Sequence, residues 1–141
     1  MIYTKLTKIA LQVAFDAHKN QKDKTGLPYV FHPFHLAEQM TDEVTTCVAL
    51  LHDVVEDTDM TFEELAQMGF TNEIIEALRL LTHDESVPYM DYVKELSKNP
   101  VAKKVKLADL AHNSDLSRLD SIDEFALRRN EKYKQAIEIL K

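Results

Sequence analysis

The stretch Ala49-Leu50-Leu51-His52-Asp53-Val54-Val55-Glu56-Asp57-Thr58 carries the strongest signal for the fold of this chain. An apolar run leads into a His-Asp pair, and an acidic pair follows three positions later. Residues four apart share one face of an α-helix, so the spacing predicts His52 beside Glu56 and Asp53 beside Asp57. We therefore expect one half-buried helical segment that presents an imidazole and three carboxylates.

Two interpretations of this stretch are open. Burying so many ionisable groups without partners would cost on the order of several kcal/mol, and a divalent cation is the simplest partner that offsets this cost. The alternative is a helix that ends in an exposed acidic tail, because runs of charged residues usually face solvent. The stretch alone does not decide between a metal site and a solvated helix end.

Length and composition predict one folded domain over residues 1–141. Apolar residues make up 45% of the chain and charged residues 29%, which is typical of globular rather than disordered proteins. The chain has only 2 glycines and 4 prolines, too few for the many turns of a β-sandwich or a barrel. These values favour a helical fold.

Charge, hydropathy and cysteine usage bear on partners and location. The net charge of −7 argues against a nucleic-acid-binding surface, which needs a basic field. No apolar run approaches the roughly 18 residues that cross a membrane, and the segment Met1–Lys5 does not begin a signal peptide. The single cysteine, Cys47, lies in an apolar run and is expected to be a reduced core residue. We expect a cytoplasmic protein that binds neither membrane nor nucleic acid.

Apolar spacing and capping residues predict an all-α domain, a single compact bundle of about seven or eight helices. The first is the amphipathic segment Thr4–Lys19, and a polar loop with Gly26 and Pro28 follows it. The other expected helices cover approximately residues 33–40, 43–56, 61–69, 73–81, 89–96, 101–114 and 122–140. Four side chains of the last helix are expected to face the core: Phe125, Tyr133, Ile137 and Leu140. The long helix and the acidic surface permit a homodimer.

Four side chains are candidate ligands of one metal ion: His32, His52, Asp53 and Asp109. A mixed nitrogen and oxygen set leaves coordination positions open and suits Mn²⁺, Fe²⁺ or a catalytic Zn²⁺. One turn farther along the helix, a carboxylate of Glu56 or Asp57 could orient water or accept its proton.

Each of these residues also has an ordinary structural explanation. A histidine before a proline, such as His32, is more often a hydrogen-bonding loop residue than a ligand. Asp109 could pair with Lys106 on the same helix. Lys24 lies in a charged loop of the kind that is usually solvated. The remaining histidines are expected on the surface or next to a ligand: His35, His83 and His112.

The order of these residues resembles the H…HD…D signature of the HD-domain metal-dependent phosphohydrolases. The closer resemblance is to the hydrolase domain of the bacterial alarmone enzymes and to small stand-alone alarmone hydrolases, which remove pyrophosphate from the 3′ position of (p)ppGpp. Three segments carry it. They are A-H-K-N-Q with K-T-G-L-P-Y and H-P in residues 17–33, L-L-H-D-V-V-E-D-T in residues 50–58, and K-L-A-D with H-N in residues 106–113.

The resemblance implies an HD-domain fold and an alarmone 3′-pyrophosphohydrolase activity. It implies one Mn²⁺ held by His32, His52, Asp53 and Asp109. It also implies assistance to the attacking water by Glu56 and Asp57, and contact with the nucleotide or its phosphates by Lys24, Thr25 and Asn113.

The chain departs from the family pattern where the nucleotide would bind. The family's loop usually reads R-K-S-G, with the arginine near the guanine base, whereas this chain has Asp23 at that position. An acid there is expected to repel phosphate. Leu110 also replaces an arginine after K-L-A-D. Two alternatives to (p)ppGpp hydrolysis therefore stay open: hydrolysis of another nucleotide or phosphoester, and a non-catalytic nucleotide-sensing module.

Overall fold

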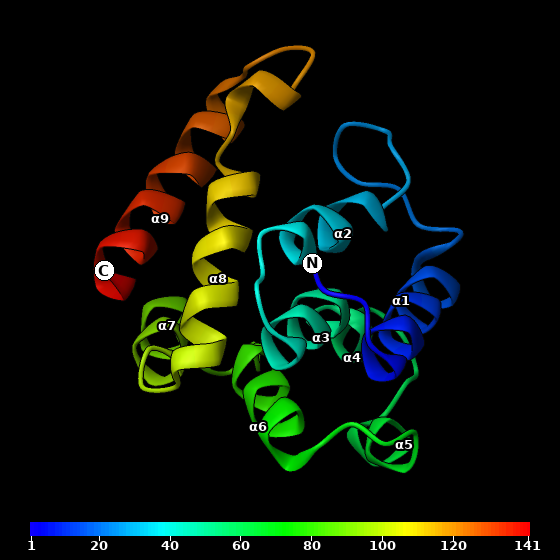
Figure 1. Ribbon diagram of the computed structural model, residues 1–141. Coiled ribbons are helices and arrows are strands. Elements are labelled where there is room, and N and C mark those ends of the chain that lie inside the picture. Colours follow the sequence, from blue (N-terminus) through cyan, green and yellow to red (C-terminus); the bar gives the residue numbers. More distant parts are fainter.

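Side-chain caps begin most of the helices in the computed structural model, which describes residues 1–141 (Figure 1). In each case a hydroxyl, carboxylate or amide oxygen accepts a hydrogen bond from a backbone N–H of the first helical turn. At Thr61, the Glu64 side chain also accepts a hydrogen bond from the backbone N–H of the cap residue, which completes a capping box. The capping residues are Thr4, Thr61, Asp42, Thr71, Asn99 and Asp123.

The caps and apolar stripes produce an all-α structure, as predicted. Its helices are α1 (Lys5–His18), α2 (Phe31–Glu38), α3 (Glu43–Leu51), α4 (Val54–Asp57), α5 (Phe62–Gln67), α6 (Asn72–Leu81), α7 (Tyr89–Leu96), α8 (Pro100–Asn113) and α9 (Glu124–Leu140). Of these, α4 is a single turn, and the other 8 helices agree with the expected number. A 3₁₀ turn, Leu116–Arg118, joins α8 to α9, and none of the helices is long and apolar enough to cross a membrane.

Helix α3 lies at the centre of the core. Every residue from Thr45 to Leu51 is buried, and α1, α2, α6 and α8 all pack against this helix (Figure 1). Cys47 is fully buried here, as predicted. Because α2 and α8 flank the end of α3, side chains from three distant parts of the sequence meet there.

The single helix predicted over residues 43–56 is wrong, because it is interrupted at His52 and Asp53. His52 Nδ1 donates to the carbonyl of Ala49 at 2.7 Å and so competes with the backbone for that acceptor. Asp53 takes φ −107° and ψ 0°, the bridge region in which many active-site residues lie. α4 then starts at Val54, and Asp57 N still donates to Asp53 O at 2.9 Å, so these two residues remain one turn apart.

The prediction for α9 is wrong at Phe125, which is 67% exposed. The side of α9 that packs on α7 and α8 instead carries Ala126, Asn130, Ala136 and Leu140. Small alanine side chains let the helices approach closely, and Phe125, one position before the first of them, points away. Tyr133 and Ile137 are partly buried, and Leu140 is fully buried, in agreement with their prediction.

Candidate metal centre and active site

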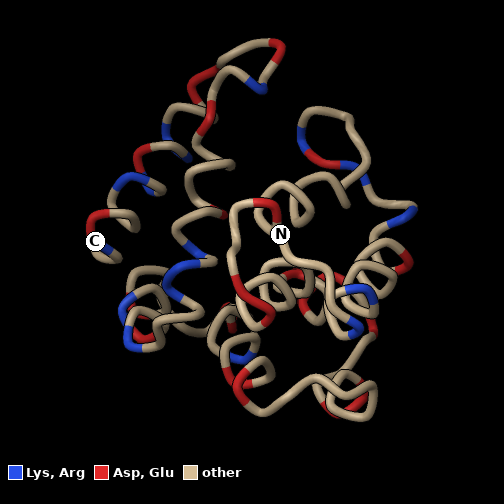
Figure 2. The backbone as a smooth tube through the Cα atoms, viewed as in Figure 1, with Lys and Arg blue, Asp and Glu red and all other residues tan.

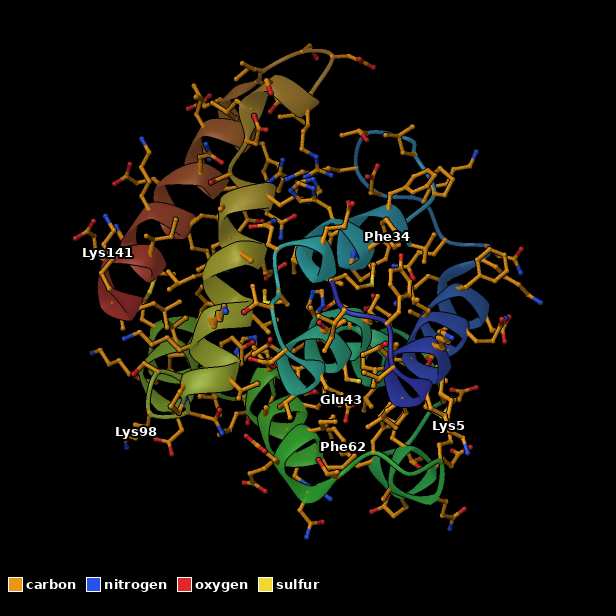
Figure 3. The ribbon with its side chains drawn as sticks, viewed as in Figure 1. Lys5, Phe34, Glu43, Phe62, Lys98 and Lys141 are labelled. Atoms are coloured by element: carbon orange, nitrogen blue, oxygen red, sulfur yellow. The ribbon has the colours of Figure 1, made fainter.

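Three helices bring the candidate ligands together. His32 lies in the first turn of α2, His52 follows the last residue of α3, and Asp109 projects from α8. All three residues are buried, and one ligand atom of each lies within 4.8 Å of the others. His32 Nε2 is 2.8 Å from Asp109 Oδ1, and His52 Nε2 is 3.6 Å from the same oxygen. Figure 3 shows side chains with nitrogen and oxygen atoms gathered between α2 and α8.

The orientation of the His52 ring indicates that a cation belongs at this point. Its Nδ1 must carry the proton, because it donates to the carbonyl of Ala49. In the neutral ring Nε2 therefore presents a lone pair, and this buried atom forms no hydrogen bond. It lies 2.9 Å from Asp53 Oδ2 and also faces Asp109. Burial lowers the pKa of His52, but the charge of Asp53 and the contacts with both carboxylates raise it well above its usual value. The position therefore favours a positive charge, which is either a proton on the ring or a metal ion that replaces that proton.

The ionisation states of the two aspartates suit metal coordination, which needs deprotonated carboxylates. Burial raises the pKa of Asp53, but the charge of His52 and hydrogen bonds lower it by more, to about 2. Burial likewise raises the pKa of Asp109, and the charge of Lys106 together with hydrogen bonds brings it well below its usual value. Both carboxylates are consequently ionised at neutral pH.

Neighbouring side chains orient three of the four candidate ligands, whereas His52 is held by the backbone carbonyl of Ala49. The Tyr29 hydroxyl donates to Asp53 Oδ2, and Asn113 Nδ2 donates to Asp109 Oδ1 at 3.0 Å. Lys106 Nζ lies 3.0 Å from Asp109 Oδ2. His112 was expected on the surface or next to a ligand, and its Nδ1 lies 2.7 Å from Nδ1 of His32. Such contacts fix ring and carboxylate orientation.

The acidic pair of α4 is held from two sides. Glu56 Oε1 accepts the backbone N–H of His83 at 3.0 Å, and Asp57 Oδ2 accepts from Gln21 Nε2 at 3.2 Å. Gln21 Oε1 is in turn 2.9 Å from His18 Nδ1. Burial raises the pKa of both carboxyl groups of the pair, and the nearby charge of Asp53 raises each further. A raised pKa brings a carboxylate closer to the range of a general base.

A cleft of about 260 Å³ opens beside His32 and is rich in basic side chains. Lys24 Nζ donates to the backbone carbonyl of Asn113 at 2.9 Å, and both residues line this cleft. Thr25 lines an adjoining cavity of about 350 Å³ and donates its hydroxyl to Asp23. The other basic residues of the cleft are Lys22, Arg118 and Arg129.

No role was predicted from the sequence for Tyr29 or Gln21, and Lys106 was named only as a partner for Asp109, an ion pair that the structure confirms. All three belong to motifs that carried the resemblance, so their motif membership was the available signal. The partners of Tyr29 and Gln21 could not be read from the motifs, since Gln21 and Asp57 are 36 positions apart.

A family model described as HD domain matches residues 10–139. The chain belongs to the HD domain family. Guanosine-3′,5′-bis(diphosphate) 3′-pyrophosphohydrolase MESH1 of Danio rerio is 35% identical, with 91% of this chain and 78% of that protein aligned. The MESH1 protein of Mus musculus is 33% identical over 90% of this chain and 79% of its own length.

The chain is also similar to a larger bacterial protein of known name and to a protein of known structure. The guanosine-3′,5′-bis(diphosphate) 3′-pyrophosphohydrolase of Aquifex aeolicus is 31% identical over 89% of this chain, which covers 18% of that protein. A structure described as a metazoan ortholog of SpoT that hydrolyses ppGpp superposes with a TM-score of 0.80 and 28% identity. The alignment covers 100% of this chain and 88% of the other. These similarities confirm the family resemblance found in the sequence.

Proposed function

We propose that this chain is a metal-dependent phosphohydrolase that removes pyrophosphate from the 3′ position of guanosine 3′,5′-bis(diphosphate). The observation that carries the proposal is the unpartnered, buried Nε2 of His52 facing Asp53 and Asp109. Relatives that are aligned over 78% and 79% of their own length, and that are named as 3′-pyrophosphohydrolases of this nucleotide, support the choice of substrate.

We infer that the ion is Mn²⁺ and that its ligands are His32, His52, Asp53 and Asp109. The donor set of two imidazoles and two carboxylates fits this ion. When bound, a divalent ion supplies Lewis-acid polarisation of a phosphate oxygen and activation of water. The hydrogen bond from Tyr29 supports this proposal, because it orients Asp53 before substrate arrives.

The proposed roles of the remaining site residues follow from their positions. Glu56 and Asp57 are proposed to accept the proton of the attacking water, and their anchoring by His83 and Gln21 supports this role. Lys24, Thr25 and Asn113 are proposed to bind the nucleotide or its phosphates, since they line the cleft beside His32 or the cavity that adjoins it.

We also propose that the protein works in the cytoplasm, because the buried, unpaired Cys47 suits a reducing compartment. We also propose that the protein forms the homodimer that the sequence permits. Sedimentation velocity measures this directly.

The deciding experiment is incubation of Mn²⁺-loaded protein with ppGpp, with GDP and pyrophosphate detected separately. Release of both products in equal amounts is expected. The Asp53→Ala variant should release neither. Hydrolysis of a different nucleotide, with ppGpp untouched, would show that the reaction class is right and the substrate wrong. Binding of ppGpp without any turnover would instead identify a sensor.

A further inference from the structure

The carboxylate of Asp23 closes the loop that precedes α2. Its Oδ1 accepts hydrogen bonds from Thr25 N at 2.8 Å, from the Thr25 hydroxyl at 2.6 Å and from Leu27 N at 3.1 Å. Gly26, with φ +86°, provides the left-handed conformation that this tight turn needs. One oxygen of Asp23, the residue expected to repel phosphate, is therefore occupied within the loop.

The second oxygen of Asp23 binds an arginine from a distant segment. Arg118 Nη2 lies 3.2 Å from Asp23 Oδ2, and the two side chains are only 16% and 8% exposed. Arg118 Nη1 also donates to the carbonyl of His112 at 2.9 Å. Arg118 belongs to the 3₁₀ turn between α8 and α9, which lies at the same end of the molecule as the loop before α2 (Figure 1).

The ion pair places a guanidinium on the wall of the cleft beside His32. Two hydrogen bonds use only part of its donors, so further N–H groups are available to a ligand. Figure 2 shows basic and acidic residues side by side in the loop before α2. Because Asp23 balances the charge of Arg118, the net positive charge of the cleft comes from Lys22, Lys24 and Arg129.

A charge-balanced guanidinium is better suited to a neutral acceptor than to a phosphate. Guanine presents two adjacent acceptors, O6 and N7, which match the fork of an arginine. Adenine presents an amino group in place of O6. This hydrogen-bond donor would face the N–H donors of the arginine and could not pair with them. The lysines and Arg129 remain for the phosphates.

We propose that Arg118, held by Asp23, is a specificity-determining residue that selects guanine over adenine nucleotides in this cleft. Asp23 is the positioning residue of the pair. The proposal rests on the proposed function for the nucleotide class, and its test is a binding measurement that needs no turnover.

The test compares GDP and ADP binding to Mn²⁺-loaded protein by calorimetry, for wild type and Arg118→Lys. Lysine keeps the charge and the ion pair but lacks the planar fork. GDP should bind at least about 10-fold more weakly to the variant, the scale of one lost bidentate contact, with ADP binding unchanged. With ppGpp as substrate, KM should rise by a similar factor while kcat changes less than about 3-fold.

The matched control is Arg128→Lys on α9, an exposed arginine paired with Glu124 in the next turn. It should leave GDP binding and KM unchanged. Asp23→Asn is the second variant, because it keeps the loop acceptor, removes the charge that holds Arg118, and should show the same selective loss of GDP. Melting temperatures of all variants report whether the fold is kept.

Three results would overturn the inference: no preference of the wild type for GDP, unchanged GDP binding in Arg118→Lys, or equal weakening of GDP and ADP. A merely structural role predicts the second of these, since lysine preserves the pair. If wild type binds GDP selectively but leaves ppGpp intact, the proposed function fails and the inference stands. If ppGpp is hydrolysed and Arg118→Lys behaves as wild type, only the inference fails.

Discussion

Lys106 Nζ lies 3.0 Å from Asp109 Oδ2, on the side of the carboxylate opposite the oxygen that faces His32. Both side chains are almost fully buried, and the rings of Tyr89 and Tyr92 surround the ammonium group at 5.7 and 5.4 Å. Burial lowers the pKa of Lys106, but the charge of Asp109 raises it by more, well above its usual value. Lys106 therefore stays charged, keeps Asp109 ionised and directs Oδ1 toward the imidazoles.

Replacing this lysine should weaken metal binding without touching a ligand. Lys106→Met is expected to lower Mn²⁺ affinity by about 10- to 100-fold, the usual scale for losing a group that orients a ligand. Competition with a chelating dye measures it. Lys104→Met, an exposed lysine of the same helix, is the control and should bind Mn²⁺ normally. Equal affinity in both variants would show that Lys106 does not orient Asp109 for the metal.

Mutations of the metal ligands and of the proton acceptor should have different effects on metal binding and turnover. Asp53→Ala and Asp109→Ala are expected to abolish Mn²⁺ binding, because each removes a charged donor. Glu56→Ala should retain the metal and lose turnover by about 100-fold or more, the scale of removing a general acid or base. Metal content and kcat are measured on the same preparations. Loss of metal in all three variants would make Glu56 a ligand.

The cap of α3 should contribute to stability in a pH-dependent way. Asp42 accepts the Thr45 N–H at 2.7 Å, so Asp42→Ala should lower the free energy of unfolding by about 1 kcal/mol at pH 7. That hydrogen bond lowers the pKa of Asp42 from its usual 3.8. A lowered pKa in the folded state means that the contribution is present at neutral pH and is lost as the pH falls through that pKa. Urea unfolding at pH 7 and at about pH 3 should show the difference between wild type and variant shrinking.

Cys47 should be unreactive in the folded protein. Burial raises the pKa of its thiol to about 12, so almost no thiolate, the reactive form, is present at pH 8. Iodoacetamide should leave the native protein unmodified and label it fully in guanidinium chloride, as read by mass spectrometry. Rapid labelling of native protein would mean that the core around α3 opens readily.

Much of the fold could be predicted because the relevant signals are local. Thr61, Thr71 and Asn99 each lie within three residues of the backbone groups that they cap, so they mark helix starts in the sequence itself. The interruption at His52 could not be predicted in this way. Its cause is a side-chain hydrogen bond to Ala49, whereas the apolar spacing alone is continuous through the whole segment.

The candidate site was predictable in its residue types but not in its supporting contacts. The order of the motifs predicts His32, His52 and Asp109 as ligands, and the fold brings these three residues together. The ion pair of Asp23 could not be anticipated, because its partner Arg118 is 95 positions away. The exposure of Phe125 likewise depends on which side of α9 meets α8, and an amphipathic pattern with two aromatic residues leaves that side ambiguous.

The interrupted segment after α3 and the Asp23–Arg118 pair are carried by different kinds of structural element. His52 and Asp53 are fixed by the buried core, whereas Asp23 and Arg118 stand on a loop and a 3₁₀ turn at one end of it. Loops accept substitutions far more readily than packed helices do. Within this family, descendants of a common ancestor can consequently diverge in the nucleotide they accept while inheriting the same buried reaction centre.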